Sequence, residues 1–185
     1  MRSAPCLLAS GIAAFTSTSH ATPPGALVVR SVDIDADGRM AASTGCGSSS
    51  RTPALEWEPP PDGTETLAVI VSVRENGVEA VHWTAWDIDP ASGALPAGIR
   101  PTASPPLQGV TTAGGVGWRP LCGLPQGARV VIEVAALSSH PPPPPTFGGA
   151  ALRARLAPHL LALGRLEAAP PVPPATPAAG EDSTP

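Results

Sequence analysis

The order of apolar and polar residues along the chain predicts a protein built mainly of β-strands. Four short runs are rich in valine, isoleucine and other residues that favour extended backbone, and turn-forming residues separate them. These runs are residues 27–34, 66–73, 81–89 and 129–137. Several short strands separated by turns indicate an antiparallel β-sandwich.

The run over residues 81–89, Val-His-Trp-Thr-Ala-Trp-Asp-Ile-Asp, is the most distinctive, and the Asn76-Gly77 pair before it is typical of a tight hairpin turn. In an extended chain His82, Thr84 and Trp86 share one face, and the residues between them share the other. His82 could therefore face a pocket. The alternative is a buried histidine hydrogen-bonded to a backbone carbonyl, and the pattern alone leaves both open.

The second half of the chain combines a loop, a helical pattern and proline-rich segments. Residues 90–117 are mainly Pro, Gly, Ala, Ser and Thr, which favours a long surface loop. Leucines at 152, 156, 160, 163 and 166 predict a helix over residues 150–167, broken or kinked at Pro158. Residues 141–145 are a polyproline segment, either a stiff loop or a ligand for a protein partner. Residues 169–185 are Pro/Ala-rich and are predicted to be a disordered tail.

The N-terminal residues 1–21 have the features of an export signal. Arg2 is followed by a short apolar run at 7–15 and by Ser19-His20-Ala21, which resembles a small-x-small cleavage site. The alternative is a disordered leader rich in alanine and serine. We therefore expect one domain over residues 22–168, periplasmic or secreted if the signal is real and cytoplasmic otherwise. No segment is long enough for a transmembrane helix.

Composition narrows the list of partners. The formal net charge is −4, and all 11 basic residues are arginine, with no basic patch, so nucleic acid is not an expected partner. If the signal is cleaved, Cys6 is lost and Cys46 and Cys122 remain. An even pair in an exported protein could form a disulfide, and two buried free thiols are the alternative.

Three blocks of sequence share a pattern with a known family. The first is residues 46–57, Cys-Gly-Ser-Ser-Ser-Arg-Thr-Pro-Ala-Leu-Glu-Trp. The second runs from residues 67–71 through Val81-His82-Trp83 to residues 95–98, and the third from residues 117–122 through Arg129 to residues 136–137. Over roughly residues 27–167 the chain thus resembles the phosphatidylethanolamine-binding proteins, also called Raf kinase inhibitor-like proteins. The resemblance implies a β-sandwich with a short C-terminal helix.

The resemblance also implies a small pocket that binds an anion, such as the phosphate of a phospholipid head group. In the family an Asp-Pro-Asp block, the histidine of a His-Trp pair, a proline-rich loop and a second histidine before an arginine build this pocket. Histidines and backbone N–H groups donate to phosphate oxygens, and carboxylates hold the histidines or an ammonium group.

This chain keeps only part of that set. His82 matches the first histidine, whereas Val73-Arg74-Glu75 stands where the family has Asp-Pro-Asp, and Glu75 alone keeps a carboxylate. Ala128 replaces the second histidine, and Trp118 replaces a tyrosine. Residues 120–124 stand in place of the proline-rich loop, and Ser50 and Thr52 replace Asn and Ser of the first block. Arg74 and Arg119 could compensate by gripping phosphate, or they are ordinary surface arginines.

We therefore expect a non-enzymatic protein that binds a small anion or phospholipid head group through His82, Glu75, Arg119, Trp118 and Arg74, with weakened affinity. The alternative is a structural or protein-interaction module that has lost ligand binding. Catalysis has little support, because Ser72 has no nucleophile-elbow motif and no acid is placed to orient His82. The histidines and cysteines have no metal-ligand spacing, and the acidic run that starts at Asp33 lacks the glutamate of a calcium loop, so neither metal nor cofactor is expected.

Overall fold

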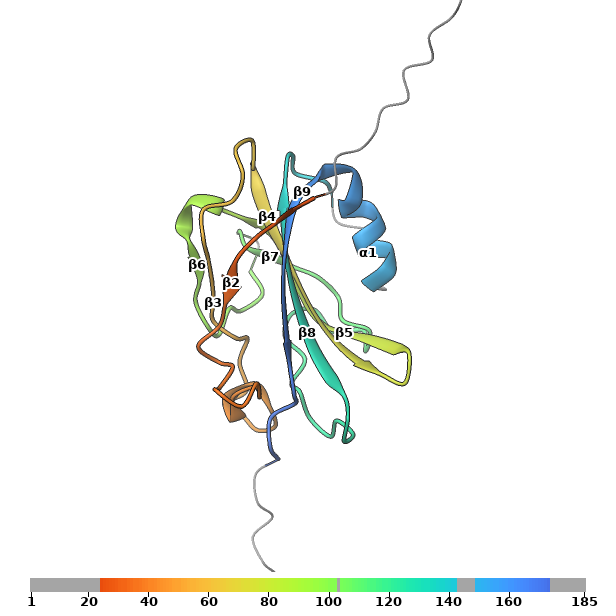
Figure 1. The fold of residues 1–185 in the computed structure, drawn as a ribbon. Helices are drawn as coiled ribbons and strands as arrows, with labels where there is room; N and C mark the ends of the chain where they lie inside the picture. The colour runs from red at the N-terminus through yellow and green to blue at the C-terminus, as the bar shows by residue number, and fades with distance from the viewer. Residues whose placement is uncertain (1–23, 103, 143–148, 174–185) are drawn as a thin grey trace, which may run out of the picture.

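The protein folds into two β-sheets and one helix, stacked in three layers (Figure 1). The computed structural model describes residues 24–102, 104–142 and 149–173. The larger sheet has the strand order β1-β9-β8-β4-β5-β7, and the smaller one has the order β2-β3-β6. All pairs are antiparallel except β1 with β9. The elements are β1 (Gly25–Ala26), β2 (Val29–Arg30), η1 (Ala42–Thr44), β3 (Leu55–Trp57), β4 (Thr66–Glu75), β5 (Val78–Ile88), η2 (Pro90–Ser92), β6 (Ala94–Leu95), β7 (Leu107–Gln108), β8 (Arg129–Leu137), α1 (Gly149–Leu156), η3 (Ala157–His159) and β9 (Leu160–Ala168).

The predicted class, a mainly β sandwich with a short helix near the C-terminus, is confirmed. Three of the four predicted strands occur as β4, β5 and β8, and they form the centre of the larger sheet. Asn76 and Gly77 both have positive φ in the turn between β4 and β5. The Asn-Gly pair therefore forms the tight hairpin turn that the sequence predicts.

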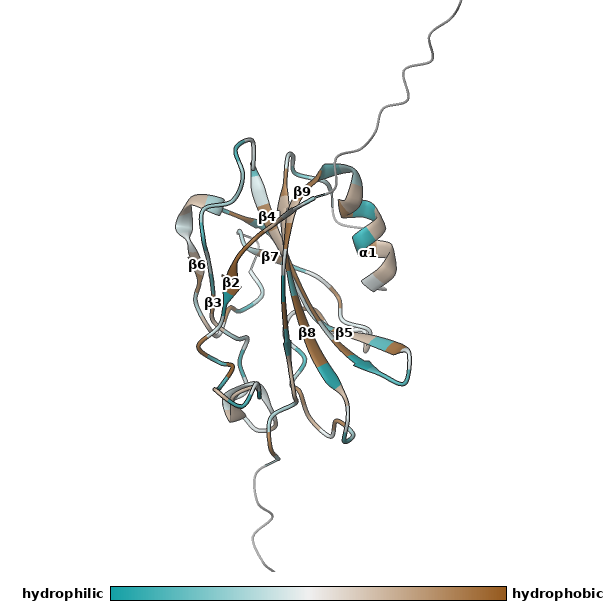
Figure 2. Ribbon diagram, in the orientation of Figure 1, coloured by the Kyte–Doolittle hydropathy of each residue, from teal (hydrophilic) through white to brown (hydrophobic). Residues whose placement is uncertain are grey.

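The main core lies between the two sheets. Inward-facing valines of β4 and β8 and Trp83 of β5 pack there against residues of β2, β3 and β6, such as Trp57. In Figure 2 the hydrophobic colour is strong along β8 and β2, where the sheets face each other. Burying such side chains stabilises the fold by about 1.5–3 kcal/mol for each large residue.

A smaller core lies on the opposite face of the larger sheet, under α1. Leu152 and Leu156 of the helix pack on Ala68, Ile70 and other outward-facing side chains of β4 and β8. Arg153 adds an ionic clamp. Its guanidinium donates to Glu79 on β5 at 2.8 Å and to Glu133 on β8 at 2.7 Å. An eight-residue helix is thus held by two leucines and one arginine.

The first predicted strand is wrong in extent. Residues 27–34 do not form one strand, because the chain leaves the larger sheet after β1 and enters the smaller one at β2. Gly164 on β9 makes this crossing possible: a Cβ at this position would collide with Val29 and with the Leu27 carbonyl. Asp33 then lies in a turn, where its buried carboxylate accepts from Arg51 and from the backbone N–H of Ala54.

The predicted helix over residues 150–167 is also wrong beyond its first half. The α-helix ends at Leu156, a 3-10 turn containing Pro158 follows, and the chain continues as strand β9. Proline removes a backbone donor and clashes with the preceding turn, so the helix stops there. Residues 160–168 then pair with β8 along its whole length.

Two further segments differ from their predicted form. Residues 90–117 are mainly loop, as predicted, but contain η2 and the short strands β6 and β7. Residues 169–173, assigned to the tail, pack beside the loop after β2: the Ala169 N–H donates to the Gly38 carbonyl, and Pro171 is buried against Gly45.

Other predictions concern residues without a described structure. The signal at 1–21 lies outside the described residues, as do residues 143–145 of the polyproline segment and the tail from 174. Within the described part of the chain, no helix has the length and apolar character needed to cross a membrane.

Candidate functional site

His82 is buried in the middle of β5 and is bonded to the chain that passes beside it. Val71 of β4 pairs with Trp83 and Ser72 with Val81, so His82 is the extra residue of a β-bulge. Bulges re-aim side chains. Here the ring Nδ1 lies 3.1 Å from the Arg119 carbonyl, and the Arg119 N–H donates to the His82 carbonyl at 2.9 Å. The structure therefore has the buried, backbone-bonded histidine that the sequence left open as an alternative.

The electrostatics of His82 favour a neutral ring. Burial lowers the pKa of His82 below its ordinary value, because a charged imidazolium loses its hydration there, and the nearby Arg119 charge acts in the same direction. The carbonyls of Arg119 and Pro120 oppose this shift only in part. With 2 % of its surface exposed, His82 fixes the position of residues 119–120 instead of presenting a cation to solvent.

Several positions that correspond to the family's other ligand groups carry apolar side chains. Val73, Ala128 and Leu121 belong to the main hydrophobic core, and Leu124 packs against it. These side chains offer no hydrogen-bond donor for an anion. At these positions the chain therefore supplies core packing where the family supplies ligand groups.

Arg74 and Glu75 lie away from His82, at the end of the β4–β5 hairpin. Arg74 is on the helix side of the sheet, where its Nε donates to Glu79 at 3.2 Å. Glu75 is half-buried and pairs through its backbone with Val78. Among the described residues, no hydrogen bond or ion pair joins either of them to Trp118 or Arg119.

A hollow of about 550 Å³ lies on the outer side of Trp118. We call it the Trp118 hollow. Three loops form its walls, and it contains two arginines and three consecutive serines. Its lining residues are Gly47, Ser48, Ser49, Ser50, Arg51, Thr52, Gly98, Ile99, Arg100, Pro101, Val116, Trp118 and Pro120.

Hydrogen bonds connect the three walls to one another. The Trp118 indole N–H donates to the Ser50 hydroxyl at 3.1 Å, and the Ile99 N–H donates to the Thr52 hydroxyl at 3.0 Å. Trp118 also packs edge-on against the buried Trp83, with 6.3 Å between ring centroids. A site with fixed walls binds without the entropy loss of ordering them.

A disulfide joins two of these walls. Cys46 directly precedes the loop 47–52, Cys122 follows Trp118 and Pro120, and their Cα atoms are 5.0 Å apart. The two cysteines that the sequence singled out are therefore partners. Both are exposed at the surface.

The charged groups of the hollow are arginines. Arg51 donates to Asp33 behind the wall at 3.1 and 3.4 Å, which leaves other guanidinium N–H groups free to donate elsewhere. Arg100 and Arg119 are exposed and form no ion pair with any described residue. The hollow thus combines positive charge, serine hydroxyls and an indole ring.

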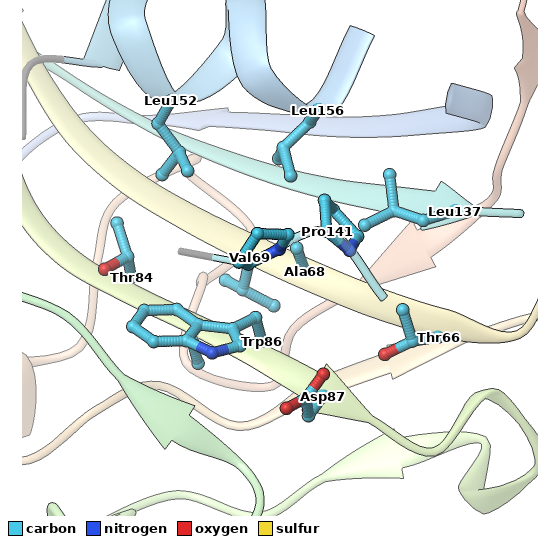
Figure 3. Close-up of a pocket in the computed structure, with 12 residues that line it drawn as sticks. Thr66, Ala68, Val69, Thr84, Trp86, Asp87, Leu137, Pro141, Leu152 and Leu156 are labelled. Atoms are coloured by element: carbon cyan, nitrogen blue, oxygen red, sulfur yellow. The ribbon is translucent and has the colours of Figure 1, made fainter. Parts of the chain in front are cut away.

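A second cavity lies between α1 and the larger sheet (Figure 3). Leu152 and Leu156 face Trp86 and Thr84 across it. Its volume is about 20 Å³, the size of a single water. Thr84 Oγ1 and Trp86 Nε1 are buried there without a partner in the described structure. This cavity is too small for a phosphate ester.

In the part of the chain that the structure describes, residues able to bind a metal do not form a cluster. No group of three or more histidine, cysteine, aspartate or glutamate side chains could hold an ion there.

The comparisons with known proteins identify the family. A family model described as phosphatidylethanolamine-binding protein matches residues 30–169. The chain belongs to this family. Two solved structures of phosphatidylethanolamine-binding proteins share its fold, each with a TM-score of 0.65. One is the homologue CT736 from Chlamydia trachomatis, at 20 % identity over 82 % of this chain and 99 % of that one. The other is YbcL of E. coli, at 22 % identity over 80 % of this chain and 99 % of that one. No curated protein sequence matches the chain.

Sequence reasoning found part of the Trp118 hollow. Of the phosphatidylethanolamine-binding family's expected site residues, Trp118 lines the hollow, Arg119 lies beside it, and His82 supports it from behind. Arg51, Arg100 and the serines also line the hollow, and they were not predicted from the sequence as site residues. The run Ser48-Ser49-Ser50-Arg51 was a usable signal, because hydroxyls next to an arginine are groups that bind phosphate.

Proposed function

We propose that this phosphatidylethanolamine-binding family member is a non-enzymatic binding protein for a small phosphate-type anion, and that the Trp118 hollow is its site. The main support for the proposal is that Arg51, Arg100 and three serines line one hollow whose walls are joined by hydrogen bonds. Arginine donates to phosphate oxygens in pairs, and hydroxyls complete the set of donors. The volume suits a small molecule.

The location of the site departs from the family pattern. His82 is buried and favours the neutral form, and Val73 and Ala128 fill the former ligand positions. In the proposal His82 acts as a positioning residue: its bond to the Arg119 carbonyl sets the path of the chain from Trp118 to Pro120.

Calorimetric titration of the full chain with glycerol 3-phosphate, phosphoethanolamine and inorganic phosphate tests the proposal. We expect saturable binding of at least one probe. Arg100→Gln should weaken it about 10- to 150-fold, the equivalent of one charged hydrogen bond of about 1.5–3 kcal/mol. Arg155→Gln, which changes an exposed arginine on α1, is the matched control and should leave the affinity unchanged.

The variant His82→Asn tests whether the ligand binds in the hollow or at His82. Asparagine retains an N–H near the ring Nδ1 position but removes the rest of the imidazole. If His82→Asn abolishes binding while Arg100→Gln does not, the ligand contacts His82 and the proposed site is wrong. Saturable binding that survives Arg100→Gln unchanged also counts against the hollow.

A structural or protein-interaction role is the second candidate. It is favoured by the apolar filling of the positions where the family has ligand groups, at Val73, Ala128 and Leu121. Absence of binding for all three probes, by a protein with a cooperative unfolding transition, would support this candidate over ligand binding.

A further inference from the structure

The Trp118 hollow has positive charge but no carboxylate in its lining. Arg51 and Arg100 are its charged members, and its other lining residues are serine, threonine, glycine, proline, isoleucine, valine and tryptophan. A zwitterionic head group such as phosphoethanolamine carries an ammonium group as well as a phosphate. That ammonium needs a carboxylate or another acceptor once it leaves water.

The one buried carboxylate beside these walls is already engaged. Asp33 is 4 % exposed, and its two oxygens accept from Arg51 and from the Ala54 N–H, the latter at 2.8 Å. It therefore holds Arg51 in place and is not directed to a ligand. Because Asp33 offsets the charge of Arg51, Arg100 is the lining residue whose positive charge is uncompensated.

We infer that the hollow selects a phosphate attached to a neutral, hydroxylated body, that is, phosphoglycerol chemistry, and discriminates against phosphoethanolamine. This inference rests on the proposed function and names the ligand class of that site. The phosphate meets the guanidinium groups, and the ligand's hydroxyls meet serine hydroxyls. An ammonium in the same space is repelled by Arg100, whose charge no carboxylate of the lining offsets.

The size and the surface of the hollow agree with a ligand larger than a phosphate ion. Its volume of about 550 Å³ exceeds what a bare phosphate fills. Ser48 and Ser49 are exposed, so their hydroxyls can exchange water for a polyol. Trp118 is held by Ser50 and supports the ligand body with its ring.

The indole ring is the feature that would favour an ammonium group. A cation over the face of a tryptophan is attracted by the ring quadrupole. At an exposed site this attraction is weak, and the uncompensated charge of Arg100 opposes it. The preference therefore depends on Arg100 and on the lack of a carboxylate in the lining of the hollow.

Replacing Arg100 by an acidic residue provides a direct test. In the full chain, glycerol 3-phosphate should bind at least tenfold more tightly than phosphoethanolamine. Arg100→Glu should lower or reverse this ratio, because it places a carboxylate where an ammonium can pair with it. Arg155→Glu makes the same change of charge on α1, outside the hollow, and should keep the wild-type ratio.

Vesicles distinguish a lipid head group from a free ester. Phosphatidylcholine vesicles doped with phosphatidylglycerol or with phosphatidylethanolamine are compared by co-sedimentation with the full chain. Retention on the phosphatidylglycerol vesicles alone, lost in Arg100→Glu and kept in Arg155→Glu, identifies a lipid head group. Binding of glycerol 3-phosphate without retention identifies a free ester.

The outcomes separate the two proposals. Equal or tighter binding of phosphoethanolamine by the wild type, or a ratio that Arg100→Glu leaves unchanged, overturns the selectivity and leaves the anion site standing. Absence of binding for every probe, in a protein that unfolds cooperatively, overturns the anion site and the selectivity together.

Discussion

Removing the Cys46–Cys122 disulfide tests how far the walls of the Trp118 hollow depend on a covalent link. The perturbation is the double variant Cys46→Ser/Cys122→Ser. The two cysteines are 76 positions apart, so the bridge closes a long loop in the unfolded chain. With that loop length, the chain-entropy relation gives about 4.5 kcal/mol of stabilisation at room temperature. That is a large part of the 5–15 kcal/mol typical of a domain.

Urea denaturation followed by tryptophan fluorescence measures the effect. We expect the double variant to lose about 2–5 kcal/mol of unfolding free energy relative to the oxidised wild type. A reductant should lower the stability of the wild type to that of the variant and should not change the variant further. The reductant series is therefore the internal control.

Ligand affinity should respond less than stability does. Without the bridge, the Trp118–Ser50 bond and the bond from the Leu121 N–H to the Thr44 carbonyl still connect the two walls. We expect glycerol 3-phosphate to bind up to roughly tenfold more weakly, the equivalent of ordering one or two side chains. A double variant as stable as the oxidised wild type would refute the reasoning, since it would show that the bridge does not constrain the unfolded chain.

Three further predictions concern buried polar and charged groups. Burial lowers the pKa of His82, so below about pH 6.5 the unfolded chain binds a proton that the native ring does not, and the free energy of unfolding should fall as the pH drops below that value. His82→Asn should flatten this part of the curve of stability against pH. Among the described residues the buried Thr84 hydroxyl has no partner, whereas Thr66 donates to the Ile88 carbonyl at 3.3 Å. Thr84→Val should therefore leave the stability in urea unchanged or raise it, and Thr66→Val should lower it by about 1 kcal/mol. Hydrogen bonding to Arg153 lowers the pKa of Glu79 from 4.5 to about 2, so the ion pair stabilises the protein above pH 4.5 and this contribution is lost as the pH falls towards 2. Arg153→Met should therefore lower the free energy of unfolding at neutral pH and weaken its dependence on acid pH. An unchanged dependence on acid pH would count against a stabilising role of this ion pair.

The long strands could be predicted from the sequence because their pattern is strong. β4, β5 and β8 combine β-branched residues with turn residues at both ends, and all three are mostly buried. The short strands β1, β2, β6 and β7 have two residues each, so they carry no periodicity. Their positions depend on partners far along the chain.

The error over residues 150–167 has a clear physical cause. Leucines at 160, 163 and 166 have helical spacing, yet they lie on a strand that β8 binds on one side and β1 on the other. Pairing with a buried strand outweighs a local helical preference. Pro158 was the local signal that the helix ends. Gly164 packs under the Leu27–Val29 segment, and its role could not be recognised from the sequence because it depends on where that distant segment lies.

The candidate site was only partly predictable. His82 and Trp118 were found through a shared motif that also implied a ligand role for His82. Burial of the ring and its bond to the Arg119 carbonyl favour a positioning role instead. Arg51 and Arg100 are single arginines in loops and look like any surface charge. Their common hollow arises from contacts between loops about 50 residues apart, such as that of Thr52 with Ile99.

The strand order has a consequence for the folding of the nascent chain. β9 is the last of the described strands to be synthesised, yet it lies inside the sheet, between β1 and β8. Until residue 168 has left the ribosome, β8 has an open edge whose residues 130–137, all apolar except Glu133, can pair with other chains. β1, made first, has no partner in the sheet until β9 arrives. The larger sheet is therefore completed only once β9 has been made, and a variant truncated before β9 is expected to aggregate.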